Sequence, residues 1–221
     1  NYFYFNFLFI FYVIYVIFLT NFKSNDKGNI LMKMTFRPTD CWRWYFDSEY
    51  DSLMLEVSSE MLFRSCYPSK MLVPDVFGEF PFSVSDATSY YQFYNSCQLL
   101  NLTDSQKVEL SINAIVAANF LKPQMPKSWY FSQQPKLYIP KVADIVEVNL
   151  QEDGQKVCLM VVEAGGNASL CIIAQASFIA MSKTFVFSEA IKVMNDRLIP
   201  IEKQSTEQAP TLDYFGFKAI S

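Results

Sequence analysis

The 221-residue sequence contains no histidine, the side chain most often used as a general base and as a metal ligand. This absence excludes Ser-His and Cys-His nucleophile pairs. Glycine is also scarce, and the one adjacent pair, Gly165-Gly166, predicts a hairpin turn rather than a phosphate-binding loop. Acidic pairs such as Glu152-Asp153 fall at predicted turns, where they are solvated. The sequence therefore predicts no catalytic residue, no metal site and no cofactor, so we expect a protein that is not an enzyme.

An excess of positive charge is missing as well. The first 33 residues hold three lysines and one aspartate, so residues 34–221 carry a net charge of −6, against −4 for the whole chain. Nucleic-acid binding requires a basic face, and this balance argues against it. We expect a protein or small-molecule partner instead.

Cysteines are few and form no C-x-x-C motif. An odd number of them is typical of reduced thiols in a cytosol. We expect all five to be buried apolar side chains: Cys41, Cys66, Cys97, Cys158 and Cys171.

Residues 1–33 begin with a long apolar and aromatic run that has no charge before Lys23. The run is short for a membrane span and lacks the basic start and small-residue cleavage site of a signal peptide. It is interpreted as an upstream stretch translated by mis-annotation, with Met32 or Met34 as the true start, or else as an N-terminal anchor. Lysines following the run would place the remainder in the cytoplasm even if the anchor is real.

The first half of the remaining chain mixes strands and helices. Residues 42–57 predict a hairpin and residues 60–67 a third strand. Residues 85–100 predict a helix with Ser85 as N-cap, and residues 103–122 predict a helix that opens with a Thr103–Gln106 capping box.

The second half is mostly β. Residues 143–150 and 155–165 predict a hairpin around Gly154, and residues 168–181 and 183–187 continue the β pattern. Residues 188–198 predict a short helix capped by Ser188. The sequence thus indicates an α+β fold, with an α/β domain over 34–127, a β-rich domain over 128–203 and a disordered tail over 204–221.

Between the halves lies "LKPQMPKSW", residues 121–129. Two prolines restrict the backbone, so this stretch is expected to be stiff and extended and to display Lys122 and Lys127. Trp129 is expected to anchor its exit in the core. Stiffness lowers the ordering cost of binding; the alternative is a plain linker whose lysines only face water.

Several segments together resemble a known family. The segments are "CWRWYFD", "MLFRS", "KMLVPDVF", "LKPQMPKSW", "LMVVEAGGNASLCIIAQ" and "EAIKVMNDRL", between about Met34 and Pro200. In this order and spacing they resemble the ZapC family of bacterial cell-division proteins. The resemblance implies a cytoplasmic, non-enzymatic protein at the midcell division septum. It would bind the tubulin-like GTPase FtsZ, promote filament bundling, stabilise the Z-ring and slow GTP hydrolysis.

The resemblance also carries expectations about fold and site. It implies an α/β N-terminal domain joined to a twisted, barrel-like C-terminal domain, and it implicates Lys122 and Lys127 in FtsZ contact. Because the body is acidic overall, a local basic spot would have to orient the encounter. We expect Arg64 and Lys70 to join the two lysines in that spot.

Other interpretations remain open. An aromatic pocket formed by Trp42, Trp44, Phe63 and Trp129 could take a short peptide, although aromatic strands more often face the core. The chain could instead be a small-ligand module built on the β-rich half, or a membrane-anchored scaffold that depends on residues 1–33. We expect a monomer or weak oligomer that contacts neither nucleic acid nor membrane.

Overall fold

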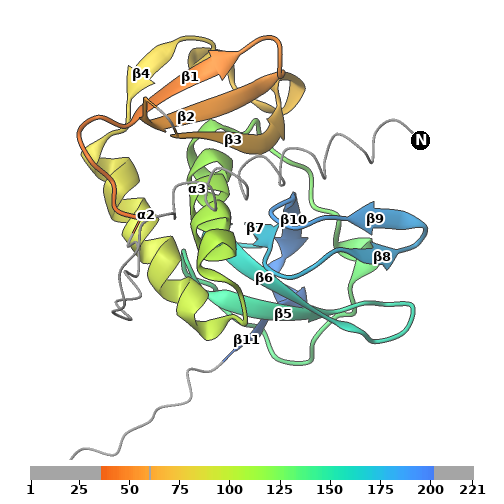
Figure 1. The fold of residues 1–221 in the computed structure, drawn as a ribbon. Helices are drawn as coiled ribbons and strands as arrows, with labels where there is room; N and C mark the ends of the chain where they lie inside the picture. Colours follow the sequence, from red (N-terminus) through yellow and green to blue (C-terminus); the bar gives the residue numbers. More distant parts are fainter. Residues whose placement is uncertain (1–35, 60, 202–221) are drawn as a thin grey trace, which may run out of the picture. The chain divides into compact units, whose positions relative to one another are not determined.

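The computed structural model describes residues 36–59 and 61–201 (Figure 1). The predicted leader over 1–33 and the predicted tail over 204–221 lie outside these residues. No helix in the described part of the chain combines the length and the apolar character that a membrane crossing requires.

A four-stranded antiparallel sheet forms the first layer. Its strands are β1 (Arg43–Asp47), β2 (Ser52–Ser58), β3 (Met61–Pro68) and β4 (Glu79–Pro81), in the order β3-β2-β1-β4. The turn between β1 and β2 forms because the Asp47 carboxylate accepts hydrogen bonds from the backbone N–H groups of Glu49 and Tyr50. The predicted hairpin and third strand are confirmed.

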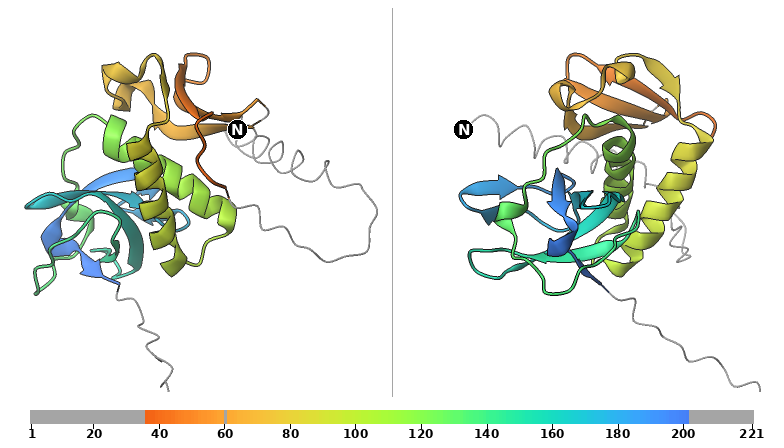
Figure 2. Two further views of the ribbon diagram at one scale, coloured as in Figure 1. Left: turned by 90° about the vertical axis from the view of Figure 1, so that its left-hand side faces the viewer. Right: turned by 180° about the vertical axis from the view of Figure 1, so that it is seen from behind.

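Two α-helices follow the sheet, α2 (Val84–Ser96) and α3 (Asp104–Phe120). The Thr103–Gln106 capping box of α3 is confirmed. The predicted N-cap of α2 is wrong by two residues, because Ser83 has the extended backbone of a cap and accepts a hydrogen bond from the N–H of Asp86. Ser85 instead lies in the first turn of the helix. The helices lie side by side (Figure 2).

The second half forms a five-stranded antiparallel sheet with strand order β10-β7-β6-β5-β11. Its strands are β5 (Ile145–Asn149), β6 (Lys156–Glu163), β7 (Ala168–Ile173), β10 (Ala190–Met194) and β11 (Ile199–Pro200). A separate hairpin pairs β8 (Phe178–Ala180) with β9 (Lys183–Phe185). The hairpin turns predicted at Gly154 and at Gly165-Gly166 are confirmed.

The helix predicted over residues 188–198 is wrong. These residues form β10, which pairs with β7, and then the 3-10 turn η5 (Asn195–Arg197). Ile191 and Val193 are buried while Lys192 and Met194 are half-buried, so the burial period is two. Ser188 has a positive φ of 65° and caps no helix.

Helix α3 contacts both sheets, since it packs against β3 on one side and against β6 and β7 on the other (Figure 1). This position explains why eight consecutive residues at its centre are buried. A second link between the halves is the hydrogen bond that Tyr67 Oη, on β3, donates to the carbonyl oxygen of Ser188, at 2.7 Å.

The fold is α+β, as predicted. Around the five-stranded sheet, buried aliphatic side chains and the rings of Phe131, Phe178 and Phe185 form the core of the second half. Within the described residues this sheet ends at β10 on one side and at β11 on the other.

Candidate functional site

The connector, residues 121–127, is extended and fixed at both ends. At its start, the N–H of Lys122 donates to the carbonyl oxygen of Met71 at 2.8 Å, and Leu121 forms an isolated bridge with Leu72. At its end, the N–H of Lys127 donates to the carbonyl oxygen of Lys192, on β10, at 2.8 Å. The connector therefore joins the loop after β3 to the edge of the second sheet and cannot swing as a free linker.

The next residue completes the cover of that edge. Ser128 is buried, and its hydroxyl oxygen accepts a hydrogen bond from the N–H of Met194 at 2.8 Å. Exposed strand edges attract unwanted pairing. Here the connector and Ser128 satisfy backbone groups of β10 that would otherwise be open.

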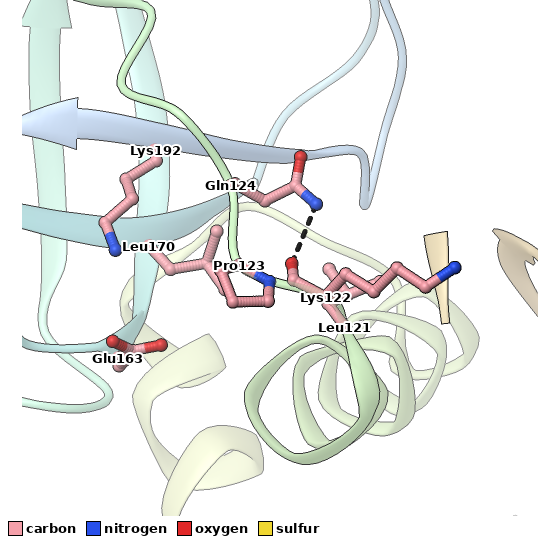
Figure 3. A pocket seen from close by; sticks show the side chains of 7 residues that line it. All are labelled: Leu121, Lys122, Pro123, Gln124, Glu163, Leu170 and Lys192. Carbon is pink, nitrogen blue, oxygen red and sulfur yellow. Dashed lines mark hydrogen bonds between the residues drawn. The ribbon is translucent and has the colours of Figure 1, made fainter. Parts of the chain in front are cut away.

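A small pocket of about 130 Å³ lies beside the connector (Figure 3). Its lining comes from the connector and from strands β6, β7 and β10: Leu121, Lys122, Pro123, Gln124, Glu163, Leu170 and Lys192. Figure 3 shows Lys192 and Glu163 on one side of Pro123, while the side chain of Lys122 reaches out on the other side. The lining thus combines the apolar side chains of Leu121, Pro123 and Leu170 with three charged side chains.

Lysines dominate the charge around the connector. The ammonium group of Lys122 donates to the carbonyl oxygen of Lys70 at 2.9 Å, which places these two exposed residues together. Lys127 and Lys192 are neighbours through their backbone bond, and both are half-buried. Among the ion pairs between described residues, none involves any of these four lysines. Their charges remain available to an acidic partner.

Of the predicted basic residues, the structure brings Lys70 and Lys122 together and places Lys127 at the far end of the same connector. Arg64 is engaged elsewhere. Its guanidinium group donates to the carbonyl oxygen of Tyr50 at 2.9 Å and lies over the Tyr50 ring, 5.2 Å from the centroid.

The predicted aromatic residues are divided among different environments. Trp42 and Trp44 are fully buried, with ring centroids 5.0 and 5.7 Å from that of Phe82. Phe63 is half-buried on β3. Core packing accounts for the two tryptophans, and the peptide pocket stays a prediction.

The prediction that Trp129 anchors the connector in the core is wrong. Its side chain is 55% exposed and its ring lies beside that of Tyr130. Ser128 takes the buried position instead, because the short 3-10 turn η4 (Ser128–Tyr130) directs that hydroxyl toward β10.

The thiols correct another expectation. Cys97 and Cys171 are buried and Cys158 is half-buried, but Cys41 and Cys66 are exposed. Burial raises the pKa of the Cys158 and Cys171 thiols to about 12 and that of Cys97 to about 11. These three thiols are therefore protonated near neutral pH and are poor nucleophiles.

Within residues 36–59 and 61–201, no group of three or more carboxylate and cysteine side chains is placed so that it could bind a metal ion. One half-buried carboxyl group, that of Glu109 on α3, has its pKa raised by burial. Burial also raises the pKa of Tyr138 to about 12, helped by its hydrogen bond to Asp144.

Sequence reasoning missed Lys192 and Glu163. The residues around Lys192 predict a helix, and helical periodicity does not place Lys192 next to the connector. Glu163 ends β6 next to a predicted turn and gave no signal of its own. Reading residues 190–194 with a period of two would have placed Lys192 on the edge strand.

Two family models together match most of the chain. Residues 35–122 match the N-terminal model of the cell-division protein ZapC, and residues 123–204 match the C-terminal model. The change from one model to the other falls within the connector.

Individual relatives agree with these matches. Cell division protein ZapC of Xenorhabdus bovienii is 44% identical over 176 residues, covering 79% of this chain and 96% of the relative. Cell division protein ZapC of Musicola paradisiaca is 41% identical over 182 residues, covering 82% and 98%. Cell division protein ZapC of Vibrio cholerae is 35% identical over 164 residues, covering 73% and 90%.

Proposed function

The chain belongs to the ZapC family of cell-division proteins, and from that premise we propose that it acts by binding FtsZ through the lysine-bearing face of the connector. A role in cell division follows from the family itself. The contact with FtsZ, the bundling of its filaments and the slowing of its GTP hydrolysis are the finer parts of the proposal.

One observation carries the proposal: four lysines that form no ion pair with any residue the structure describes surround a fixed, extended connector in a chain that is acidic overall. FtsZ is also taken to be acidic, so nonspecific attraction between the two proteins is weak. A local basic patch can then set the orientation and the rate of encounter. A backbone that is already fixed loses little further entropy when it binds.

The size of the pocket favours a contact surface over a ligand site. Small-molecule sites usually enclose roughly 300–1,000 Å³, whereas the pocket at the connector measures about 130 Å³. A single partner side chain fits there, with Lys192 and Glu163 at the rim and the backbone of the connector alongside.

The proposal extends to a non-enzymatic mode of action in the cytoplasm at midcell. It is supported by the complete absence of histidine and by the raised pKa values of the buried thiols, which leave those groups unreactive. Bundling would need two contacts for each bridge, a dimer, or a change in the FtsZ filament itself.

The test is co-sedimentation of the full chain with purified FtsZ, with and without GTP, together with phosphate release. Wild-type protein should pellet with FtsZ polymers in the presence of GTP and should lower FtsZ GTPase activity. The double variant Lys122→Glu/Lys127→Glu should lose at least about tenfold in apparent affinity, since it places two negative charges at the contact.

A matched control separates this effect from net charge. Lys136→Glu/Lys156→Glu changes the charge by the same amount at two exposed lysines that do not line the connector. It should pellet like the wild type. Equal pelleting by both double variants, with both folded by near-ultraviolet circular dichroism, would refute the assignment of the contact to the connector.

A further inference from the structure

A short segment before β5, residues 137–139, has the features of an edge to which another strand could pair. Residues 137–139 alternate, with Leu137 and Ile139 67% and 79% exposed and Tyr138 between them packed against the core of the second half. Tyr138 donates its hydroxyl hydrogen to the Asp144 carboxylate, which fixes the alternation. Two large aliphatic side chains are thereby presented on one outer side.

The chain is held on both sides of this segment. Before it, the N–H of Gln134 donates to the carbonyl oxygen of Asp196 at 2.8 Å, and after it there are two further hydrogen bonds. Ala143 donates its N–H to the carbonyl oxygen of Val161 at 2.8 Å, and Gln92 on α2 donates its side-chain amide to the carbonyl oxygen of Val142 at 3.3 Å. Residues 137–140 make no backbone–backbone hydrogen bond with any other residue that the structure describes. Open backbone groups at residues 137–139 and exposed apolar side chains on alternate residues can serve as a template for an added strand, which would end at Pro140 because proline has no N–H.

The described chain ends close to this template. The N–H of Ile201 donates to the carbonyl oxygen of Ile145, which lies only three residues after Val142. Residues 202–210, "EKQSTEQAP", continue the sequence as a mainly polar stretch. Nine residues can span up to roughly 30 Å when extended, which is ample to reach a segment adjacent to the start of β5.

The sequence beyond that stretch has the pattern of a strand. Residues 211–220 read "TLDYFGFKAI", in which Leu212 and Tyr214 alternate with Asp213, and Phe215 and Phe217 alternate with Gly216 and Lys218; the alternation shifts by one residue between Tyr214 and Phe215, as at a β-bulge. This sequence lies beyond residue 204, where the match to the family model ends. The cell-division role leaves it without an assigned purpose.

The charge at the start of the candidate strand matches as well. Exposed Lys136 and Lys141 lie on either side of Leu137 and Ile139, whereas the candidate strand carries Asp213 between its first two apolar side chains and its own lysine, Lys218, near its end. We propose that residues 211–220 add as a strand to residues 137–140 of the same chain. The short tether favours this occupant over a second copy, because it holds the segment at an effective concentration in the millimolar range.

Hydrogen–deuterium exchange on the full chain tests the proposal. The amides of Leu137 and Ile139, which point to the same side of a strand, should exchange about tenfold more slowly in the full chain than in a chain shortened by residues 202–221, as expected for a site mostly occupied by a tethered segment. The shortened chain keeps the Ile201–Ile145 hydrogen bond, so the start of β5 is unchanged.

Two substitutions in the full chain supply matched controls. Ile139→Asp should abolish the protection at Leu137, because it places a carboxylate where the added strand packs. Ile179→Asp makes the same change at a 65% exposed residue of β8 and should leave the protection intact. Both positions are exposed, so both variants should fold.

Two results would overturn the proposal. Equal exchange with and without residues 202–221 would show that the segment does not bind there. Protection that disappears on dilution would assign the position to a second copy of the chain.

Discussion

At the scale of single residues, Asp86 shows how one buried carboxylate joins several elements. It is 5% exposed and accepts hydrogen bonds from the N–H of Ser83 at 2.9 Å, from Asn119 Nδ2 at 3.0 Å and from Trp44 Nε1 at 3.4 Å. The same side chain therefore closes the capping box of α2, ties α2 to α3 and fixes the indole of β1. This arrangement explains why Trp44 belongs to the core.

Asp86→Ala is expected to lower the free energy of unfolding by about 2–4 kcal/mol, since it removes half of a capping box and leaves the buried Trp44 Nε1–H without its acceptor. Urea denaturation of the full chain measures the change. Asp104→Ala is the control: Asp104 lies in the first turn of α3 and pairs only weakly with Lys107, at 3.9 Å. That variant should lose less than about 1 kcal/mol; equal losses would contradict the role assigned to Asp86.

At the scale of elements, the connector and β10 depend on one another. The connector covers the edge of β10 through Lys127, Ser128 completes the cover, and β10 in turn brings Lys192 to the pocket. The four lysines Lys70, Lys122, Lys127 and Lys192 therefore lie around the connector only when the edge strand β10 is formed.

Ser128→Ala removes the hydroxyl acceptor of the Met194 N–H, and that amide should exchange with solvent at least about tenfold faster in the variant, which corresponds to a loss of roughly 1–2 kcal/mol in local opening. Hydrogen–deuterium exchange resolved to Met194 is the measurement. Ser132→Ala, at a half-buried serine in the next part of the loop, should leave the Met194 amide unchanged. No difference between wild type and Ser128→Ala would mean that the Ser128 hydroxyl does not protect this edge of β10.

The elements also show where sequence reasoning succeeds. The strands over 42–67 and the two hairpins around glycine turns could be predicted because alternation and turn residues agree there. The α3 helix could be predicted from its capping box. These patterns involve residues that are close in sequence, and the hydrogen bonds that form each turn and cap join the same residues.

Failures arose where a distant partner decides the outcome. Residues 188–198 contain good helix formers after a serine, but pairing of β10 with β7 overrides that propensity. Ser83 rather than Ser85 caps α2 because Asp86 is three residues beyond it and completes the box. The sequence predicts that Trp129 is buried in the core, but Ser128 is buried instead, because its hydroxyl oxygen accepts the hydrogen bond of the Met194 N–H on β10. The partnership of Lys70 with Lys122 spans 52 residues and has no local signal.

At the scale of the whole molecule, buried thiols couple stability to alkaline pH. Burial raises the pKa of Cys171 to about 12, and it raises the pKa of Tyr67 well above its ordinary value. Each group keeps its proton in the folded state at a pH where the unfolded chain has lost it. Their stabilising contribution is complete below about pH 9 and is lost as the pH rises toward 12.

The free energy of unfolding should therefore fall between about pH 9 and pH 11, by up to about 1.4 kcal/mol per pH unit for each such group. Urea denaturation in the presence of a reductant measures the slope. In Cys171→Ala, the free energy of unfolding should fall less steeply with pH, because the contribution of this one thiol is removed. The variant should be less stable at every pH, because the substitution leaves a cavity. An unchanged slope in Cys171→Ala would contradict the assignment to this thiol.

The central claim at this scale is that an acidic chain meets FtsZ through the face of its connector. Position 125 is the most direct place for a probe. Met125 is 79% exposed and lies between Lys122 and Lys127, so replacing it leaves both lysines unchanged. The decisive measurement is site-specific photo-crosslinking of the full chain to GTP-polymerised FtsZ, with the photoreactive amino acid at position 125 or, as control, at the exposed position 179 on β8. The account predicts a crosslink to FtsZ from position 125 and little or none from position 179. Crosslinking from position 179 alone, or equally from both positions, would contradict it.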